Sequence, residues 1–454
     1  MNVPDRTSPP EAGPIRPFDF PDVDRRRLPN GLALHTARMG RLPVVSVNLF
    51  MRAGEAALDP MRAGLAVLAG DALEGGTRQR SGADLAEALE RIGARLGAST
   101  GWEGTSVSLS CLASRLEQGL ALLAEAVLEP DFPDAEVGRA RNQQLARIRQ
   151  ARMDPGALAS DEIARRIFAA NVPYARAQLG TAESVGAFGA RHLHGYTDAC
   201  WRPEAGGLVV VGDVDADEIE AMAAEAFAGW EGAAGLAADF EVAPATTERR
   251  VWIVDRPGSV QSEIRVGHVG ASRTDPGLPA LKVMNTLFGG TFTSRLNLNL
   301  RERNGFTYGV RSRFALRSRP GPFVVSTAVG SEVTAAAVGE IMTELDTLVA
   351  SGVRAEEVEA ARDFMAGVFP LRLETVGQVA SRLTESVVYG LPDDFHATYR
   401  ERIRGVTPED ANGAVRRYVR PGEAQIVVVG DASAVRQDVD ALGLGPVEVL
   451  PATE

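Results

Sequence analysis

Two polar side chains downstream of a glycine pair are the first candidates for chemistry in this sequence. Gly289 and Gly290 follow an apolar run, and Arg301 and Tyr308 come after them, seven positions apart. A guanidinium and a phenol both donate hydrogen bonds to carbonyl oxygens, and a phenol can also stabilise a developing oxyanion. If the two side chains reach one space, they suit a peptide backbone. The spacing alone is not specific, because most such pairs are ordinary surface or packing residues.

The residues around this pair predict the elements that position it. The two glycines supply backbone freedom, and Leu296, Leu298 and Leu300 continue a buried element that reads as a short helix. The dipeptide at 304–305, Asn-Gly, is a typical left-handed end for that helix. The pattern therefore predicts a glycine loop, a short helix ending near Arg301, and a strand that begins near residue 308.

Composition excludes several classes of protein. The chain has 454 residues and a formal net charge of −12, and Lys282 is its only lysine. An acidic chain without a basic cluster is a poor candidate for binding nucleic acid. Basic peptides would suit it better than acidic ones, but only if the negative charge lines the binding surface.

The sequence gives no sign of a membrane or secretory protein. No uninterrupted apolar run approaches the roughly 20 residues that span a bilayer. The first residues, Met-Asn-Val-Pro-Asp-Arg, do not resemble a signal peptide. We expect a cytoplasmic protein without membrane contact, and a periplasmic location stays open.

Cysteines and histidines offer little metal chemistry. Cys111 and Cys200 have no metal-ligand spacing and form no disulfide framework, and the strand-like alternation around Cys111 predicts a buried thiol. His192 and His194 form a His-x-His pair that is a candidate metal contact. An ordinary lead-in to the turn at Trp201 is the favoured interpretation of that pair.

The second half of the chain repeats the first. Arg202-Pro203 and the run 208–213, Leu-Val-Val-Val-Gly-Asp, recur as Arg420-Pro421 and the run 426–431, Ile-Val-Val-Val-Gly-Asp. The segments 132–137 and 353–358 match at nearly the same offset of about 220 residues, in the same order. Matching order and offset predict two copies of one α+β unit, each a mainly antiparallel sheet with helices packed on one face.

This repeat sets the expected domain organisation. Residues 1–28 are rich in Pro, Asp and Arg and predict an extended N-terminal arm. Residues 29–231 then form the first domain and residues 248–454 the second. Residues 232–247 are rich in Ala and Gly and predict the linker between them.

The organising segment then resembles a known family. A duplicated α+β chain with Gly-Gly-Thr-Phe-Thr-Ser-Arg-Leu-Asn-Leu-Asn-Leu-Arg, followed by Tyr-Gly-Val, resembles the second half of pitrilysin/insulinase-like metallopeptidases, which include the mitochondrial processing peptidase. The match covers nearly the whole chain after residue 28. In that family this arginine and tyrosine hold substrate at a zinc site on another domain. The resemblance thus implies catalytic and substrate-binding roles for Arg301 and Tyr308, and substrate binding for Gly289 and Gly290.

The zinc motif of that family, His-x-x-Glu-His, is missing from the matching helix near residues 63–77. The two histidine positions hold Val67 and Asp71, and the glutamate position holds Gly70. The distal glutamate ligand is also absent, since its expected position falls near Ala146 or Arg147. Catalytic zinc sites of this kind need three protein ligands, so the resemblance implies no metal in this chain.

Taken together, these features predict the non-catalytic, substrate-binding subunit of a heterodimeric zinc peptidase that cleaves extended peptides. The expected partner is a similar chain that carries His-x-x-Glu-His and holds the zinc. Asp71 and Glu74 line the shared chamber or, as the favoured alternative, a solvated helix face. Two alternatives stay open: a peptide-binding scaffold with no role in proteolysis, and a self-sufficient peptidase with another metal arrangement.

Overall fold

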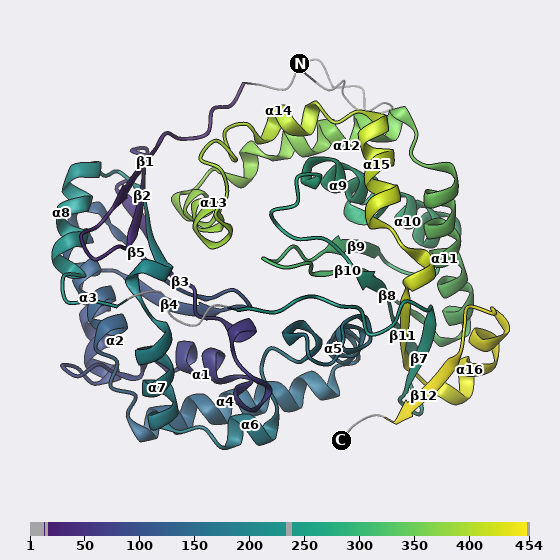
Figure 1. Ribbon diagram of the computed structural model, residues 1–454, viewed down its shortest axis with the longest axis horizontal. Helices are drawn as coiled ribbons and strands as arrows, with labels where there is room; N and C mark the ends of the chain where they lie inside the picture. The colour runs from purple at the N-terminus through teal and green to yellow at the C-terminus, as the bar shows by residue number, and fades with distance from the viewer. Residues whose placement is uncertain (1–12, 14–16, 233–237, 452–454) are drawn as a thin grey trace, which may run out of the picture.

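The computed structural model describes residue 13, residues 17–232 and residues 238–451 of the chain. Figure 1 shows two halves that face one another, each built on one sheet with helices around it. Each sheet has six strands. Within the described residues, no helix is long and apolar enough to cross a membrane.

The first sheet has the order β1-β2-β6-β3-β5-β4. All neighbours in it are antiparallel except β2 and β6. The repeated Val-Val-Val run forms the fully buried strand β6, between a parallel and an antiparallel neighbour. The strands are β1 (Val23–Arg27), β2 (Ala33–Arg38), β3 (Val44–Met51), β4 (Arg95–Thr100), β5 (Thr105–Leu112) and β6 (Gly206–Gly212).

The second sheet repeats this plan with the order β12-β7-β11-β8-β10-β9, except that its outer strand β12 is parallel to β7. The second Val-Val-Val run forms β11, again buried between a parallel neighbour, β7, and an antiparallel one, β8. This equivalence confirms the predicted duplication. The strands are β7 (Arg250–Asp255), β8 (Gln261–Val269), β9 (Val310–Phe314), β10 (Pro322–Gly330), β11 (Gln425–Gly430) and β12 (Val447–Pro451).

Sixteen α-helical segments surround the two sheets in the part of the chain that the structure describes. Local sequence explains many of their ends: the helix at 82–91 begins with a capping box between Ser81 and Asp84. The first half contains α1 (Leu65–Asp71), α2 (Gly82–Arg91), α3 (Leu116–Leu128), α4 (Asp134–Met153), α5 (Pro155–Ile167), α6 (Ala182–Gly186), α7 (Ala190–Cys200) and α8 (Ala216–Ala226). The second contains α9 (Leu278–Asn285), α10 (Arg295–Asn297), α11 (Thr334–Ser351), α12 (Ala355–Val368), α13 (Val376–Tyr389), α14 (Tyr399–Arg404), α15 (Pro408–Tyr418) and α16 (Ala432–Ala441).

The two halves exchange one helix each, which the sequence did not predict. Helix α13 of the second half packs on β3 and β6, and α5 of the first half packs on β8 and β11 (Figure 1). Asn48 of β3 donates a hydrogen bond to Thr384 of α13 at 3.1 Å, and Arg265 of β8 donates one to the Gly156 carbonyl of α5 at 3.1 Å. Helices thus cover both faces of each sheet, and the expectation of one covered face holds only for each half's own helices.

The predicted arm and linker are partly described. Residues 23–27 of the arm form the edge strand β1, whereas residues 1–12 and 14–16 lie outside the described residues. Residues 233–237 of the linker also lie outside them, and Phe240 beyond this gap packs edge-on against Tyr174, with ring centroids 5.1 Å apart. The domain boundaries themselves stay a prediction.

Candidate functional site

The helix that matches the zinc motif, α1, is held at its start by a buried carboxylate. Glu55 is 0% exposed and accepts hydrogen bonds from the backbone N–H groups of Gly64, at 2.9 Å, and Val67, at 3.1 Å. Burial raises the pKa of Glu55, although these two bonds oppose that shift. Val67, at the first histidine position, is itself buried. This end of α1 is therefore a packed and capped helix start.

At the glutamate position of the motif, a side chain would displace a neighbouring residue. A Cβ at Gly70 would lie 2.6 Å from Oγ1 of Thr100, so α1 passes directly against β4. Thr100 also donates a hydrogen bond to the Ala66 carbonyl at 3.2 Å. The close approach of α1 and β4 takes up the space that a general-base side chain would need.

An ion pair joins the two helices that would supply the remaining zinc ligands. Asp71, at the second histidine position of α1, pairs with Arg147 of α4, at the expected distal-ligand position. A guanidinium thus neutralises the carboxylate that a metal would otherwise hold. Within the described residues, no group of three or more His, Cys, Asp or Glu side chains is placed to bind a metal ion.

The histidine pair and the cysteines have structural roles. His192 accepts a hydrogen bond from the Gly189 N–H at 3.1 Å, and the His194 ring packs edge-on against Phe132 with centroids 5.1 Å apart. Cys111 and Cys200 are buried and form no disulfide in the described structure, and burial raises the pKa of Cys111 to about 11. These positions match the structural interpretations favoured from the sequence.

Arg301 lies in a π-helical turn, Leu298–Arg303, that continues α10. Its guanidinium stacks over the Phe292 ring, 4.0 Å from the centroid, and pairs with Glu302 at 3.2 Å. The arginine side chain is 31% exposed, and the Phe292 residue is 63% exposed. Leu298 is also exposed, so only two of the three leucines in the predicted helix are buried.

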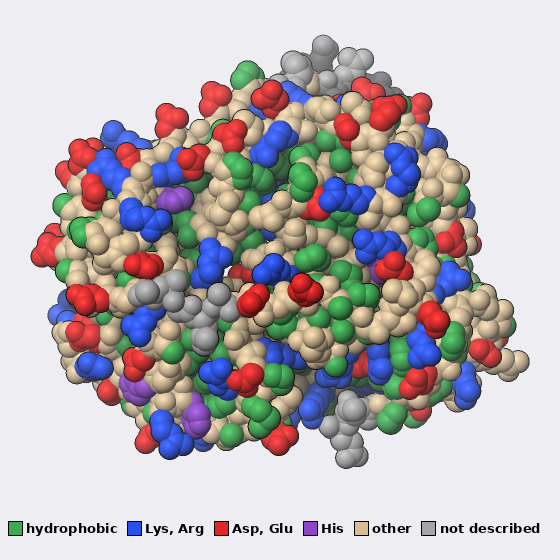
Figure 2. Space-filling view, viewed as in Figure 1, with side chains coloured by type: hydrophobic (Ala, Val, Ile, Leu, Met, Phe, Trp, Pro, Cys, Tyr) green, Lys and Arg blue, Asp and Glu red, His purple; other side chains and the backbone are tan. Residues whose placement is uncertain are grey.

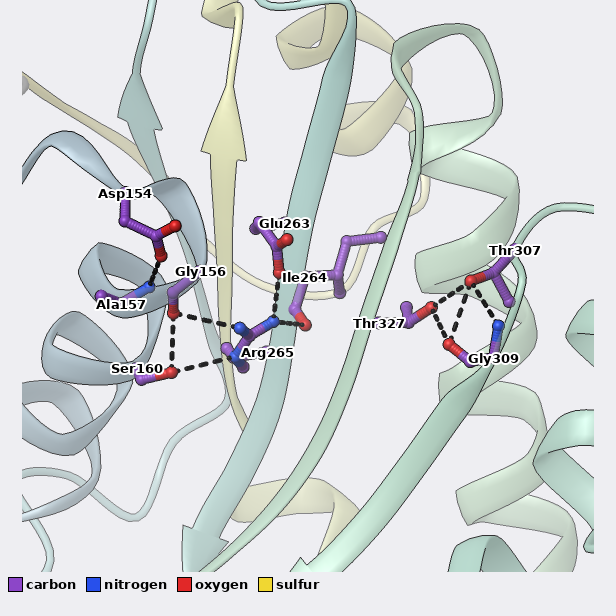
Figure 3. A network of polar contacts seen from close by, with 10 residues as sticks. All are labelled: Asp154, Gly156, Ala157, Ser160, Glu263, Ile264, Arg265, Thr307, Gly309 and Thr327. Carbon is purple, nitrogen blue, oxygen red and sulfur yellow. Dashed lines mark hydrogen bonds and ion pairs between the residues drawn. The ribbon is translucent and has the colours of Figure 1, made fainter. Parts of the chain in front are cut away.

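Tyr308 is 98% exposed and lies two residues before β9, rather than at its start. The backbone around it is nevertheless fixed. The Thr307 hydroxyl donates to the Gly309 carbonyl and accepts from the Gly309 N–H. The Thr327 hydroxyl of β10 donates to the Thr307 hydroxyl and to the Gly309 carbonyl, and all four distances are 2.9–3.1 Å (Figure 3). Among the described residues, no hydrogen bond or ion pair joins Tyr308 to Arg301. Their convergence on one substrate stays a prediction.

Asn297 connects the Arg301 turn to β9, and its role was not predicted. It is 5% exposed; its Nδ2 donates to the Val310 carbonyl at 2.8 Å and its Oδ1 accepts from the Val310 N–H at 3.1 Å. Asn285 makes a similar contact one step along, donating to the Ser312 carbonyl at 3.1 Å. The two asparagines therefore occupy the outer edge of β9 as a neighbouring strand would. The Asn-Leu-Asn repeat near residue 297 was the available signal.

The glycine pair makes this close approach possible. Gly289 and Gly290 lie in a π-helical turn, Thr286–Gly290, rather than in the predicted loop. A Cβ at Gly289 would lie 2.6 Å from the Ser312 nitrogen of β9. Gly289 thus lets the turn after α9 contact the strand edge directly, while its predicted role in substrate binding stays untested.

A large cavity lies beside this segment, between the two halves. Its volume is about 830 Å³. Side chains from α5, α9, α12, α13, β8, β9 and β10 line it, together with Gly289 and Gly290, whereas Arg301 and Tyr308 do not. The predicted segment therefore contributes its glycines to this cavity and its two donors to another surface.

Known proteins match the chain in both halves. The profile of the insulinase peptidase family M16 matches residues 39–180, and that of the M16 inactive domain matches residues 187–365. A solved M16 inactive-domain structure from Pseudomonas fluorescens is similar, with a TM-score of 0.86, 25% identity, and coverage of 91% of this chain and 99% of that one.

Curated relatives have mixed names. An uncharacterized zinc protease from Mycobacterium tuberculosis is 27% identical over 95% of this chain and 99% of its own length. A protein from Helicobacter pylori named a non-peptidase homolog is 26% identical over 86% of this chain and 90% of its own length. Both kinds of name occur at the same level of similarity, so the relatives alone do not decide activity. With both halves matched, the chain, which has degenerate residues at its own zinc-ligand positions, is a member of the insulinase-like M16 peptidase family.

Proposed function

We propose that this chain is the non-catalytic, substrate-binding subunit of a heterodimeric zinc peptidase that cleaves extended peptides. The partner would be an M16-type chain that carries His-x-x-Glu-His and holds the zinc. Arg301 would bind the peptide backbone, and the Tyr308 phenol would stabilise the oxyanion that forms at the partner's metal.

The observation that carries this proposal is the exposed phenol of Tyr308. Four hydrogen bonds, two between Thr307 and Gly309 and two from the Thr327 hydroxyl of β10, hold the residues on both sides of Tyr308, yet its side chain is 98% exposed. An immobilised backbone that presents an unpartnered phenol suits a ligand supplied from outside the chain. The Asp71–Arg147 ion pair supports the same division of labour, because the metal would have to come from a second protein.

Strand β4 offers a place for an extended peptide. It is the outer strand of the first sheet and pairs only with β5 among the described strands. An exposed sheet edge can bind a peptide by strand addition. The outer edge of β9 in the second sheet is instead occupied by Asn285 and Asn297. Strand addition would therefore take place at the first sheet.

Reconstitution with a His-x-x-Glu-His chain from the same genome tests the proposal. The mixture should hydrolyse an unfolded peptide, and Tyr308→Phe should lower turnover by about 10²–10³-fold while the complex still forms. Tyr418→Phe, which removes a phenol hydroxyl bonded to Asp275, should leave turnover unchanged. Unaltered turnover in the Tyr308 variant would remove this residue from the mechanism.

The scaffold alternative remains a second candidate, because one relative is named a non-peptidase homolog. It predicts peptide binding by the isolated chain and no hydrolysis with any partner. Metal analysis tests the remaining alternative, a self-sufficient peptidase. One equivalent of zinc together with activity in the isolated chain would contradict both the subunit proposal and the scaffold alternative.

A further inference from the structure

The cavity between the halves is strongly basic, although the chain is acidic. Seven arginines and the only lysine line it, against one carboxylate, Glu385. The whole chain carries a formal net charge of −12, and the outer face in Figure 2 mixes acidic and basic side chains. Such a concentration of one sign in a cavity focuses the electrostatic potential on an anionic ligand.

Part of this charge is buried without enough counter-charge. Arg273 is 5% exposed; its Nη2 bonds Glu385 at 3.1 Å, and its Nη1 has no hydrogen-bond partner in the described structure. Glu385 also pairs with Arg382 at 3.2 Å, so one carboxylate serves two guanidinium groups. His396 is 5% exposed, and its Nε2 is likewise without a partner. An unsatisfied buried donor such as Arg273 Nη1 that borders a cavity indicates a missing acceptor.

The pKa values of neighbouring cations follow the same pattern. Burial, with Arg273 nearby, lowers the pKa of Lys282 to about 7. Arg382 and Arg402 also face Lys282 and lower it, whereas Glu385 raises it. Burial lowers the pKa of Arg317 to about 10. A bound anion would relieve both groups.

Two further arginines are free to reach a ligand. Arg311 and Arg313 alternate with buried residues along β9, so their side chains leave the same face of the sheet, about 6.6 Å apart along the strand. Both are exposed, and neither forms a hydrogen bond or ion pair with the described residues. Because two asparagines occupy the outer edge of β9, a ligand must be held here by side chains and not by strand addition.

The rest of the lining favours a peptide over a bare inorganic anion. Phe364, Met365, Phe369 and Phe395 add apolar surface to the cavity lining. A phosphate or a small polyanion gains nothing from such a surface, whereas a peptide can bury apolar side chains against it. The volume of about 830 Å³ lies in the usual range of ligand pockets.

We propose that this cavity binds a carboxylate-rich segment of an extended peptide, with Arg311 and Arg313 pairing with acidic side chains at alternate positions. Guanidinium groups bind carboxylates through two parallel hydrogen bonds, which selects Asp and Glu over their amides. The inference rests on the proposed peptide-binding role and adds the substrate class, acidic peptides.

Fluorescence anisotropy with the full-length chain tests this. The probe is a dye-labelled ten-residue peptide with Glu at alternate positions and Leu between them, compared with its Gln counterpart. The acidic peptide should bind at least about tenfold more tightly, and its affinity should fall as salt is raised. Equal binding of the two peptides would overturn the proposal.

Two double variants locate the site. Arg311→Gln with Arg313→Gln should weaken binding of the acidic peptide about tenfold. Arg416→Gln with Arg436→Gln makes the same change in net charge at exposed helix positions outside the cavity and should leave binding unchanged. Equal losses in both would mean a general charge effect and would contradict the assignment. Tighter binding of inorganic tripolyphosphate than of the peptide, lost in the first variant, would show a small-anion site and overturn it as well.

Lys282 gives an independent readout, because it is the only lysine in the chain. Acidic peptide should protect its amine from acetylation, as measured by mass spectrometry, whereas the Gln peptide should not. Equal acetylation with both peptides would count against occupancy of the cavity. Neither measurement needs the partner or zinc, so a failed reconstitution would reject the proposed function and leave this binding test decisive on its own.

Discussion

Asn297→Leu should separate the turn that carries Arg301 from the strand that follows Tyr308. The Asn297 amide donates to the Thr291 carbonyl at 3.0 Å and the Val310 carbonyl at 2.8 Å, and accepts from the Val310 N–H at 3.1 Å. Val310 is 0% exposed, so water cannot replace these bonds without opening the site. The two orphaned groups of Val310, its N–H and its carbonyl, at about 1–3 kcal/mol each predict a loss of about 2–6 kcal/mol in the free energy of unfolding.

Urea unfolding gives the total loss, and hydrogen exchange gives its location. The Val310 amide should exchange faster in Asn297→Leu than the global loss of stability explains, because Asn297 is its acceptor. Asn299→Leu is the matched control, since Asn299 is equally buried but bonds Glu340 and Glu344 of α11. It should destabilise the protein without selective exchange at Val310.

Two results would refute this account of Asn297. One is a change in unfolding free energy below about 0.5 kcal/mol, which is the range of ordinary surface substitutions. The other is a Val310 amide that stays as protected in Asn297→Leu as in Asn299→Leu. In the reconstituted complex, Asn297→Leu should also lower turnover, because it acts on the placement of Arg301 and Tyr308, whereas the control should retain it.

Three further outcomes follow from other contacts. Burial opposes ionisation of Glu357, but its two bonds from Arg295, at 2.6 and 2.8 Å, help to lower its pKa from 4.5 to about 2. Glu357→Gln should therefore lose about 2–3 kcal/mol at pH 7, and the difference should narrow as pH falls toward 2. Lys282→Met should be more stable than the wild type below pH 7, and this advantage should vanish above 10.5, because the folded state disfavours the charged amine. Gly289→Ala should cost about 1–3 kcal/mol in thermal unfolding, since its Cβ would press on Ser312.

Each of these has a control or a contradicting result. Gly138→Ala, where a Cβ would meet nothing within 4 Å, should not destabilise, and an equal loss there would remove the packing argument for Gly289. A pH-independent difference for Glu357→Gln would mean that the carboxylate is not held ionised by its arginine. A constant difference between pH 6 and 11 for Lys282→Met would show that its amine is not perturbed by burial.

The sequence was sufficient for features that are local or repeated. The two Val-Val-Val runs lie at equivalent places in their sheets because each is flanked by the same order of elements, so their order alone predicted the duplication. The capping box at Ser81 needed only four neighbouring residues. The missing zinc motif was visible because its ligands must stand at fixed positions on one helix.

Features that join distant elements could not be predicted in this way. The distal-ligand position was expected near Ala146 or Arg147, but the pairing of Arg147 with Asp71 depends on how α4 crosses α1. The exchange of α5 and α13 depends on which uncovered sheet face each helix meets, and both helices are amphipathic enough to suit either half. Asn297 resembled a polar residue on a helix surface until β9 supplied its partners.

Net charge was the least transferable of the sequence signals. A formal charge of −12 favoured basic ligands only if the acidic residues lined the binding surface. The cavity has the opposite lining, because strand alternation directs Arg311 and Arg313 to one face and α13 adds Arg382 beside them. Charge on a protein acts through its local distribution, and within a Debye length of about 8 Å the cavity lining outweighs the distant outer surface. The acidic total disfavours the approach of anions in general, whereas the lining of the cavity favours it.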